Sequence, residues 1–127
     1  MLFRSGRQMI ARLIALLFYA REIAHREHLK TQSYAQHVAL NEFYIAIVDR
    51  ADAIAEAYQG RHGIVDDIPV LTMEVSGSPA DKLTKILSAV EKLRYTAVEK
   101  NDTTIQNLID EAIAQFLSTL YKLNNLK

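Results

Sequence analysis

The chain of 127 residues contains no cysteine and no tryptophan, and it has only two prolines and four glycines. Without cysteine it can form neither disulfides nor thiolate metal sites, which fits a cytoplasmic setting. The scarcity of proline and glycine, in a chain that is 50% hydrophobic, favours long uninterrupted helices. A charge excess of either sign is also lacking. Fifteen basic and fifteen acidic side chains cancel, so no net field attracts nucleic acid or a membrane surface.

The hydrophobic run near the N-terminus is too short to cross a bilayer. It extends from Leu13 to Ala20 behind Arg4, Arg7 and Arg12, whereas a membrane helix needs about 20 apolar residues. The arginines and the run together look like a short secretion signal, but the helical pattern continues past Arg21. We therefore expect a first helix here, within a single domain that covers residues 1–127.

Apolar residues recur at helical spacing in four segments. The predicted helices cover about 3–29, 33–59, 79–100 and 102–124. Ser33 is expected to cap the second helix, and Gly60 and Gly63 to close it. Ser78 followed by Pro79 is a strong start signal for the third.

The lengths of the connections predict the topology. The first and third links are a few residues, which favours two antiparallel hairpins. The second link, Arg61–Gly77, can extend about 55 Å, whereas the second helix is about 40 Å long. It can therefore return along the bundle and start the third helix parallel to the second. We expect an all-α, ferritin-like four-helix bundle with one long crossover.

The second helix has two apolar faces. One face, at helical spacing, consists of Leu40, Phe43, Ile47, Ala51, Ile54 and Tyr58. The opposite face mixes apolar and polar side chains: His37, Asn41, Ile45, Val48, Asp52 and Glu56. The first face would form the core, and the second would contact another subunit around a polar site.

Four residues on the first hairpin form a candidate metal site. His25, His37, Asp52 and Glu56 follow one another at intervals of 12, 15 and 4. Imidazole nitrogens and carboxylate oxygens suit divalent first-row metals such as iron. The interval of four places both carboxylates on one face of a helix.

This spacing resembles that of the Dps family, the miniature ferritins that form hollow shells. The resemblance covers about 35 residues, including the text DRADAIAEAYQGRHG. It implies iron (Fe2+/Fe3+) as the bound metal, ferroxidase and iron-storage activity, and a site at a two-fold interface between subunits. His25, Asp52 and Glu56 would come from one chain and His37 from its partner. His28 and Asn41 would lie beside the ligands.

The sequence also departs from that family. The family has a second acidic ligand where this chain has Asn41, an aromatic where it has Arg26, and often a lysine-rich tail that is absent here. The text HLKTQSYAQHVALNEFYIAIVDRADAIAEAYQG and the ending YKLNNLK are similar to short ferritin-like proteins encoded by phages. That resemblance implies the alternative hypothesis: a non-enzymatic bundle with a degenerate site and an assembly role. We expect the protein in the cytoplasm of a bacterial cell. It stays open whether its gene is bacterial or viral, and whether the chain is an enzyme.

Other motifs carry less chemistry. Glu22 and His25 have the Glu-x-x-His step of di-iron sites inside bundles, but the motif does not recur with its partner glutamates. The later helices offer only Glu91, Glu99 and Glu111. Three N-terminal arginines in a neutral chain do not predict DNA binding. No phosphate-binding glycine loop, nucleophile elbow or zinc spacing occurs.

Overall fold

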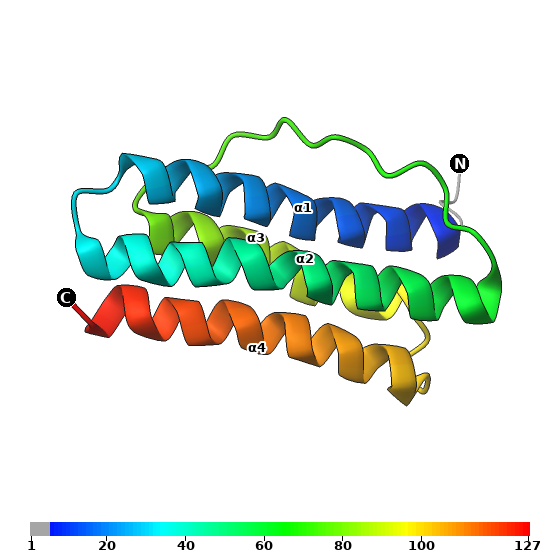
Figure 1. The fold of residues 1–127 in the computed structure, drawn as a ribbon. Helices are drawn as coiled ribbons and strands as arrows, with labels where there is room; N and C mark the ends of the chain where they lie inside the picture. Colours follow the sequence, from blue (N-terminus) through cyan, green and yellow to red (C-terminus); the bar gives the residue numbers. More distant parts are fainter. Residues whose placement is uncertain (1–5) are drawn as a thin grey trace.

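The computed structural model describes residues 6–127, which form four α-helices (Figure 1). The helices are α1 (Gly6–Lys30), α2 (Tyr34–His62), α3 (Pro79–Ala97) and α4 (Thr103–Asn125). No strand occurs in residues 6–127. The predicted all-α four-helix bundle is therefore confirmed. No helix within this range is long and apolar enough to cross a membrane.

Three helices begin at side chains that accept a hydrogen bond from the first turn. Ser33 accepts from the backbone N–H of Gln36 at 3.2 Å. Ser78 and Asp81 form a reciprocal capping box, and Pro79 stands at the first position of α3. Asp102 accepts from the backbone N–H of Ile105 at 3.3 Å. The predicted caps at Ser33 and Ser78 are thus confirmed.

Some predicted helix ends were wrong by a few residues. Gly60 does not close α2, because one glycine costs a helix only about 1 kcal/mol and the helix continues to His62. Gly63 follows as the C-cap, with a φ of 92° that few other residues adopt. α3 ends at Ala97 rather than near residue 100. The predicted start of the first helix, near Phe3, lies outside the described residues.

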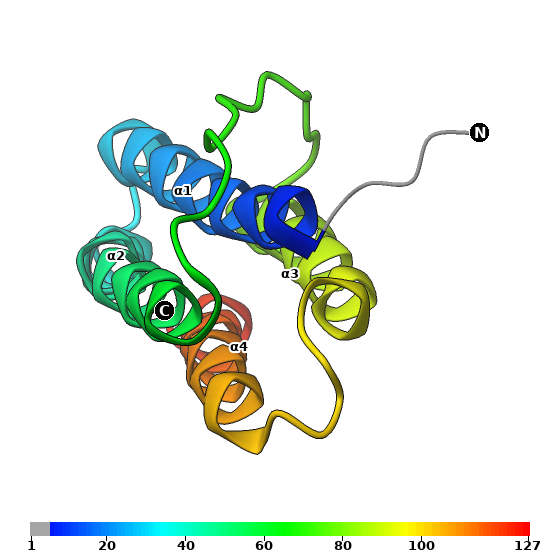
Figure 2. The ribbon, with the colours of Figure 1, turned by 90° about the vertical axis from the view of Figure 1, so that its right-hand side faces the viewer.

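The helices pack in a ring in which each contacts two neighbours (Figure 2). α1 packs against α2 and α3, and α4 packs against the same two helices. Glu27 at the end of α1 pairs with Lys82 at the start of α3. Arg61 at the end of α2 pairs with Asp102 at the start of α4, at 3.0 Å. Each helix is therefore antiparallel to both neighbours, and α3 runs parallel to α2, as the connection lengths predicted.

The crossover, residues 63–78, runs lengthwise over α1 (Figure 1). Its side chains that pack against the core recur mostly at every third position: Val65, Ile68, Leu71 and Val75. Ile64, which precedes Val65, and Val70, which lies between Ile68 and Leu71, are exposed. A repeat of three is that of polyproline II, whereas a strand alternates every second residue. The crossover is therefore an extended strap that covers one side of α1.

The core lies between the four helices and is built from their inward stripes. The predicted core face of α2 is buried at all six positions. Phe43 of α2 meets Phe116 of α4 edge to face, with ring centroids 4.9 Å apart. Both rings are fully buried, so this contact joins the first hairpin to the second.

Candidate functional site

Three histidines and one tyrosine cluster between α1 and α2, near the turn that joins them. The His28 and His37 rings stack with centroids 3.9 Å apart. His25 stacks on Tyr44 at 4.3 Å, and His28 meets the edge of the Tyr44 ring at 5.2 Å. The antiparallel hairpin thus brings His25 and His37, predicted as ligands, into one cluster within one chain. We call these four residues the histidine cluster.

The last turn of α1 fixes the orientation of His37. Its Nδ1 lies 2.9 Å from the backbone oxygen of His28, one of the carbonyls that a helix end leaves without a partner. Because a carbonyl oxygen only accepts, Nδ1 donates the proton, and in the neutral ring the lone pair lies on Nε2. Metal-binding imidazoles are commonly held by such a bond to a backbone carbonyl. The same bond would also suit a histidine that only caps a helix.

His28 is buried, and one nitrogen of its ring lacks a hydrogen-bond partner. Its side chain is 8% exposed, and its Nδ1 has no partner among the described residues. Burial lowers the pKa of His28, and the neighbouring His37 and His25 lower it further. The cluster therefore favours a neutral His28, and a neutral imidazole is the form that binds metals.

Asn41 stands one turn after His37, where the Dps family has an acid. Tyr44 donates a hydrogen bond from its hydroxyl to Asn41 Oδ1 at 2.9 Å. The amide oxygen, which is the atom an ion would use, thus already has a proton donor. Asn41 therefore supports the ring of Tyr44 against His25, and it supplies no negative charge.

Asp52 and Glu56 lie on α2 but away from the histidine cluster. Both are exposed. Fifteen residues separate His37 from Asp52, which at 1.5 Å per residue is about 22 Å along the helix. Within residues 6–127, no three histidine, aspartate or glutamate side chains are arranged to hold one ion. One chain alone thus does not assemble the predicted quartet.

The structure of one chain shows which of the four predicted ligands lie near one another. His25 was assigned to the same chain's Asp52 and Glu56, with His37 from the partner. The structure instead stacks His25 on Tyr44, which lies eight residues, or about 12 Å, before Asp52. Within one chain, His25 therefore lies in the same cluster as His37 rather than beside Asp52 and Glu56, and the division of the ligands between two subunits stays a prediction.

The outward face of α2 leaves several apolar side chains exposed. Tyr34 is 81% exposed and Ile45 is 57% exposed. The positions on this face follow one another at alternating intervals of four and three: Tyr34, Val38, Asn41, Ile45, Val48 and Asp52. That alternation is the repeat by which one helix packs along another.

Other predicted residues take ordinary structural positions. Glu22 pairs with Arg26 at 2.8 Å on the surface of α1, so the Glu22–His25 step forms no site inside the bundle. The Arg26 hydrogen bond, more than any other contact, holds the pKa of Glu22 below its ordinary value. His62 is exposed, and its ring meets Tyr58 at 4.6 Å.

His28 and Tyr44 belong to the cluster, and neither is among the ligands that the sequence predicts. A signal for both existed, because His25 and His28 are three residues apart, and His37 and Tyr44 are seven apart. Helical spacing places each pair on one face. Which faces meet depends on how α1 and α2 are aligned, and the spacing does not fix that alignment.

Comparison with known proteins gives a family and one distant relative. A model described as a family of unknown function (DUF5856) matches residues 28–123. An "uncharacterized 14.6 kDa protein in mobD-ri intergenic region" of Enterobacteria phage T4 is 26% identical over 113 residues. That alignment covers 87% of this chain and 84% of the phage protein. No solved structure matches.

Proposed function

Because the chain belongs to this family of unknown function, its function has to be argued from the site, and we propose an intersubunit iron-binding protein. Two copies pair through the outward faces of their α2 helices. His25 and His37 of one copy and Asp52 and Glu56 of the other bind iron, and the site oxidises ferrous ions. The observation that carries the proposal is the histidine cluster beside an unpartnered apolar face.

The positions of the ligands on α2 fit a two-fold axis. In an antiparallel pair of α2 helices, His37 of one copy is level with Asp52 of the other when the axis passes midway between those positions. That midpoint falls between Tyr44 and Ile45. Ile45, exposed at the centre of the face, would then pack close to its own copy. Burying an isoleucine contributes about 2 kcal/mol at each side.

The ligand chemistry supports iron bound to two imidazoles and two carboxylates. Neutral nitrogen donors and anionic oxygens both bind ferrous iron, and His37 Nε2 is available because Nδ1 donates to a carbonyl. Each ferrous ion would give one electron to dioxygen, and the ferric product is more strongly held by the carboxylates. With Asn41 in place of an acid, the site keeps two carboxylates and has one negative charge fewer than an acid there would give, so we expect it to hold one iron ion tightly.

Anaerobic addition of ferrous iron followed by air tests this proposal. We expect ferric absorbance to appear about tenfold faster than in buffer. The variants His37→Ala and Asp52→Ala should both remove this gain, although they alter opposite ends of α2. Asp49→Ala, an exposed carboxylate one turn from Asp52, is the matched control and should keep it. Oxidation at the buffer rate in the wild-type chain would disprove the ferroxidase proposal.

A second candidate function is assembly without metal chemistry, in the manner of a phage-encoded structural bundle. It is favoured by the bond from His37 to the end of α1, which a purely structural histidine also makes. Under this alternative the pairing of two copies survives in His37→Ala and Asp52→Ala, and no iron is bound. Light scattering and iron titration on the same samples separate the two functions. A monomer at all concentrations contradicts both.

A further inference from the structure

A second feature lies on the side of α1 that faces the crossover. There, α1 and residues 68–73 of the crossover line a cavity of about 830 Å³ that is partly open to solvent. Its walls come from two extended stretches, one helical and one strap-like, so it is elongated along α1. None of the histidine cluster lines it. Its volume falls in the range of sites that bind small molecules, about 300–1,000 Å³.

The walls of this cavity are mostly apolar. Phe18 and Ile23 contribute from α1, and Ile68, Val70 and Met73 contribute from the crossover. Phe18 is 39% exposed and Val70 is 90% exposed, so these side chains are left partly in water. Covering them with an apolar chain is favourable in proportion to the area removed from water.

The cavity is held open by the packing of the crossover. Tyr19 donates a hydrogen bond from its hydroxyl to the backbone oxygen of Met73, which ties the strap to α1 at one end of the cavity. Ile68 and Leu71 pack against the bundle core. Because these contacts fix the strap on both sides of Val70, filling the cavity requires no rearrangement of the helices.

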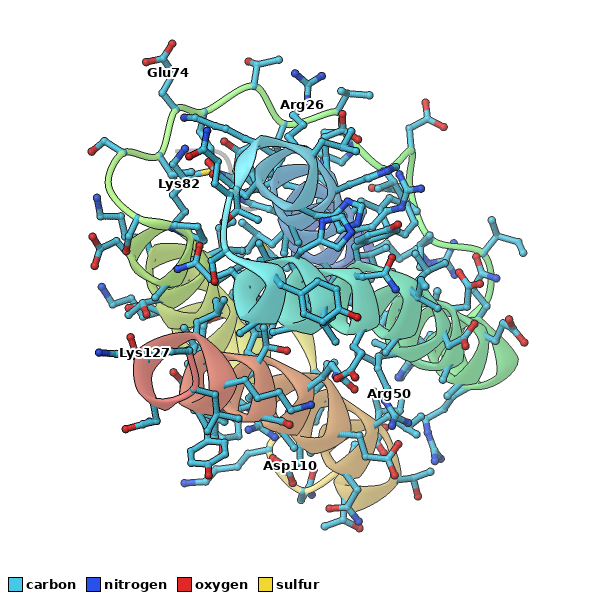
Figure 3. All side chains as sticks on the ribbon, turned by 60° about the vertical axis from the view of Figure 1, so that its left-hand side comes forward. Arg26, Arg50, Glu74, Lys82, Asp110 and Lys127 are labelled. Carbon is cyan, nitrogen blue, oxygen red and sulfur yellow. The ribbon has the colours of Figure 1, made fainter. Side chains whose placement is uncertain are left out.

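Two arginines and one glutamate line the cavity along α1. Arg26 Nε lies 2.8 Å from Glu22, and Arg21 lies 3.7 Å from the same carboxylate. Two guanidinium groups thus share one carboxylate, which leaves one positive charge beside an apolar cavity. Figure 3 shows Arg26 at the top of the view, on the side where the crossover runs, and Arg50 toward the lower right.

We propose that this cavity binds a single-chain amphiphilic anion such as a medium-length acyl carboxylate. The apolar chain lies along α1 between Phe18 and Val70. The anionic head accepts hydrogen bonds from Arg21 and Arg26, whose forked donors match a carboxylate. Glu22 keeps the two guanidinium groups together before the ligand arrives. A neutral or cationic head would not use the excess positive charge.

Calorimetric titration of the chelator-treated protein with decanoate tests the proposal, and it does not depend on the iron site. We expect one decanoate per chain. Octanoate, two methylenes shorter, should bind about tenfold more weakly if the chain is buried. Decanol, which has the same chain without the charge, should also bind about tenfold more weakly. Equal affinities for all three would overturn the proposal.

Two variants assign the binding to this cavity. Arg26→Gln should weaken decanoate about tenfold, because Glu22 then neutralises the remaining Arg21. Arg50→Gln is the matched control: Arg50 pairs with Glu111 on the far side of the bundle, and its replacement should leave binding unchanged. Val70→Asp places a negative charge beside the chain, and it should abolish binding without unfolding the bundle because Val70 is exposed. Unchanged decanoate binding in both Arg26→Gln and Val70→Asp would disprove the proposal. It would also be disproved if Val70→Asp changed the oligomer size and that change accounted for the lost binding.

Discussion

At the scale of single residues, His28 is a group through which pH acts on stability. Its folded-state pKa lies below the ordinary value of 6.5, because the ring is buried next to two other imidazoles. The unfolded chain therefore binds more protons than the folded one at mildly acid pH. The contribution of the neutral His28 to the free energy of unfolding is fully present above the ordinary pKa. It decreases as the pH drops below that value.

We therefore expect the urea midpoint of the metal-free protein to fall between pH 7.5 and pH 5. The variant His28→Phe keeps a ring to stack on His37 but does not titrate, so it should flatten this pH dependence. His62→Gln, a change at an exposed histidine, should leave the dependence as it is. A wild-type midpoint that is constant over this range would contradict the assignment to His28.

The carboxylates act in a separate pH window. Arg26 lowers the pKa of Glu22, and hydrogen bonds from Ser78 lower the pKa of Asp81. For a lowered carboxylate pKa, the stabilisation is lost only as the pH falls below the ordinary values of 4.5 and 3.8. A change of the urea midpoint between pH 7.5 and pH 5 is therefore due to the titration of imidazole rather than of these carboxylates.

At the scale of elements, the start of α3 determines where the crossover ends. Ser78 accepts a hydrogen bond from the N–H of Asp81 at 3.1 Å, and Asp81 accepts one from the N–H of Ser78 at 3.0 Å. Both bonds are local in sequence. This is why the start of α3 could be predicted from Ser78 and Pro79 alone.

Removing this cap should destabilise the whole chain by a small amount. We expect Ser78→Ala to lower the free energy of unfolding by about 1 kcal/mol, measured by urea denaturation at pH 7. Ser88→Ala, at an exposed position in the middle of α3, is the control and should change it by less than about 0.5 kcal/mol. Equal effects of the two changes would show that the cap does not stabilise α3.

Elements without local signals were harder to predict. Gly60 looked like a helix end, but tertiary packing of Tyr58 against the core carries α2 past it. The crossover was expected only as a link. Its inward side chains recur mostly at every third residue, because it lies alone on α1 with no neighbouring strand to impose a repeat of two. That property depends on its surroundings rather than on its composition.

At the scale of the whole molecule, the bundle depends on the aromatic contact between its two hairpins. We expect Phe43→Ala to lower the free energy of unfolding by about 4 kcal/mol, because the cavity left against Phe116 cannot collapse fully. That loss is a large part of the about 5–15 kcal/mol that stabilises a typical domain. Leu117→Ala, at a half-exposed position of α4, should cost less than about 1 kcal/mol. Denaturation by urea checks both, and a cost of under 1 kcal/mol for Phe43→Ala would contradict this assignment.

The fold was more predictable than the site for a physical reason. Helical periodicity and connection length already specify which faces are buried and that α3 runs parallel to α2. The site depends on the alignment of α1 with α2, which sets His25 against Tyr44 and His28 against His37. That alignment follows from packing of many side chains. The link between the histidines and Asp52 would depend further on a second copy.

The direction that the crossover gives to α3 also has an electrostatic consequence. Each helix carries a macrodipole equivalent to about half a positive charge at its N-terminus and half a negative charge at its C-terminus. Because every helix is antiparallel to both neighbours in the ring, each positive end lies between two negative ends. The macrodipoles therefore largely cancel at both ends of the bundle. A chain whose side-chain charges also sum to zero thus presents little long-range field, and what it binds is selected by contact at short range.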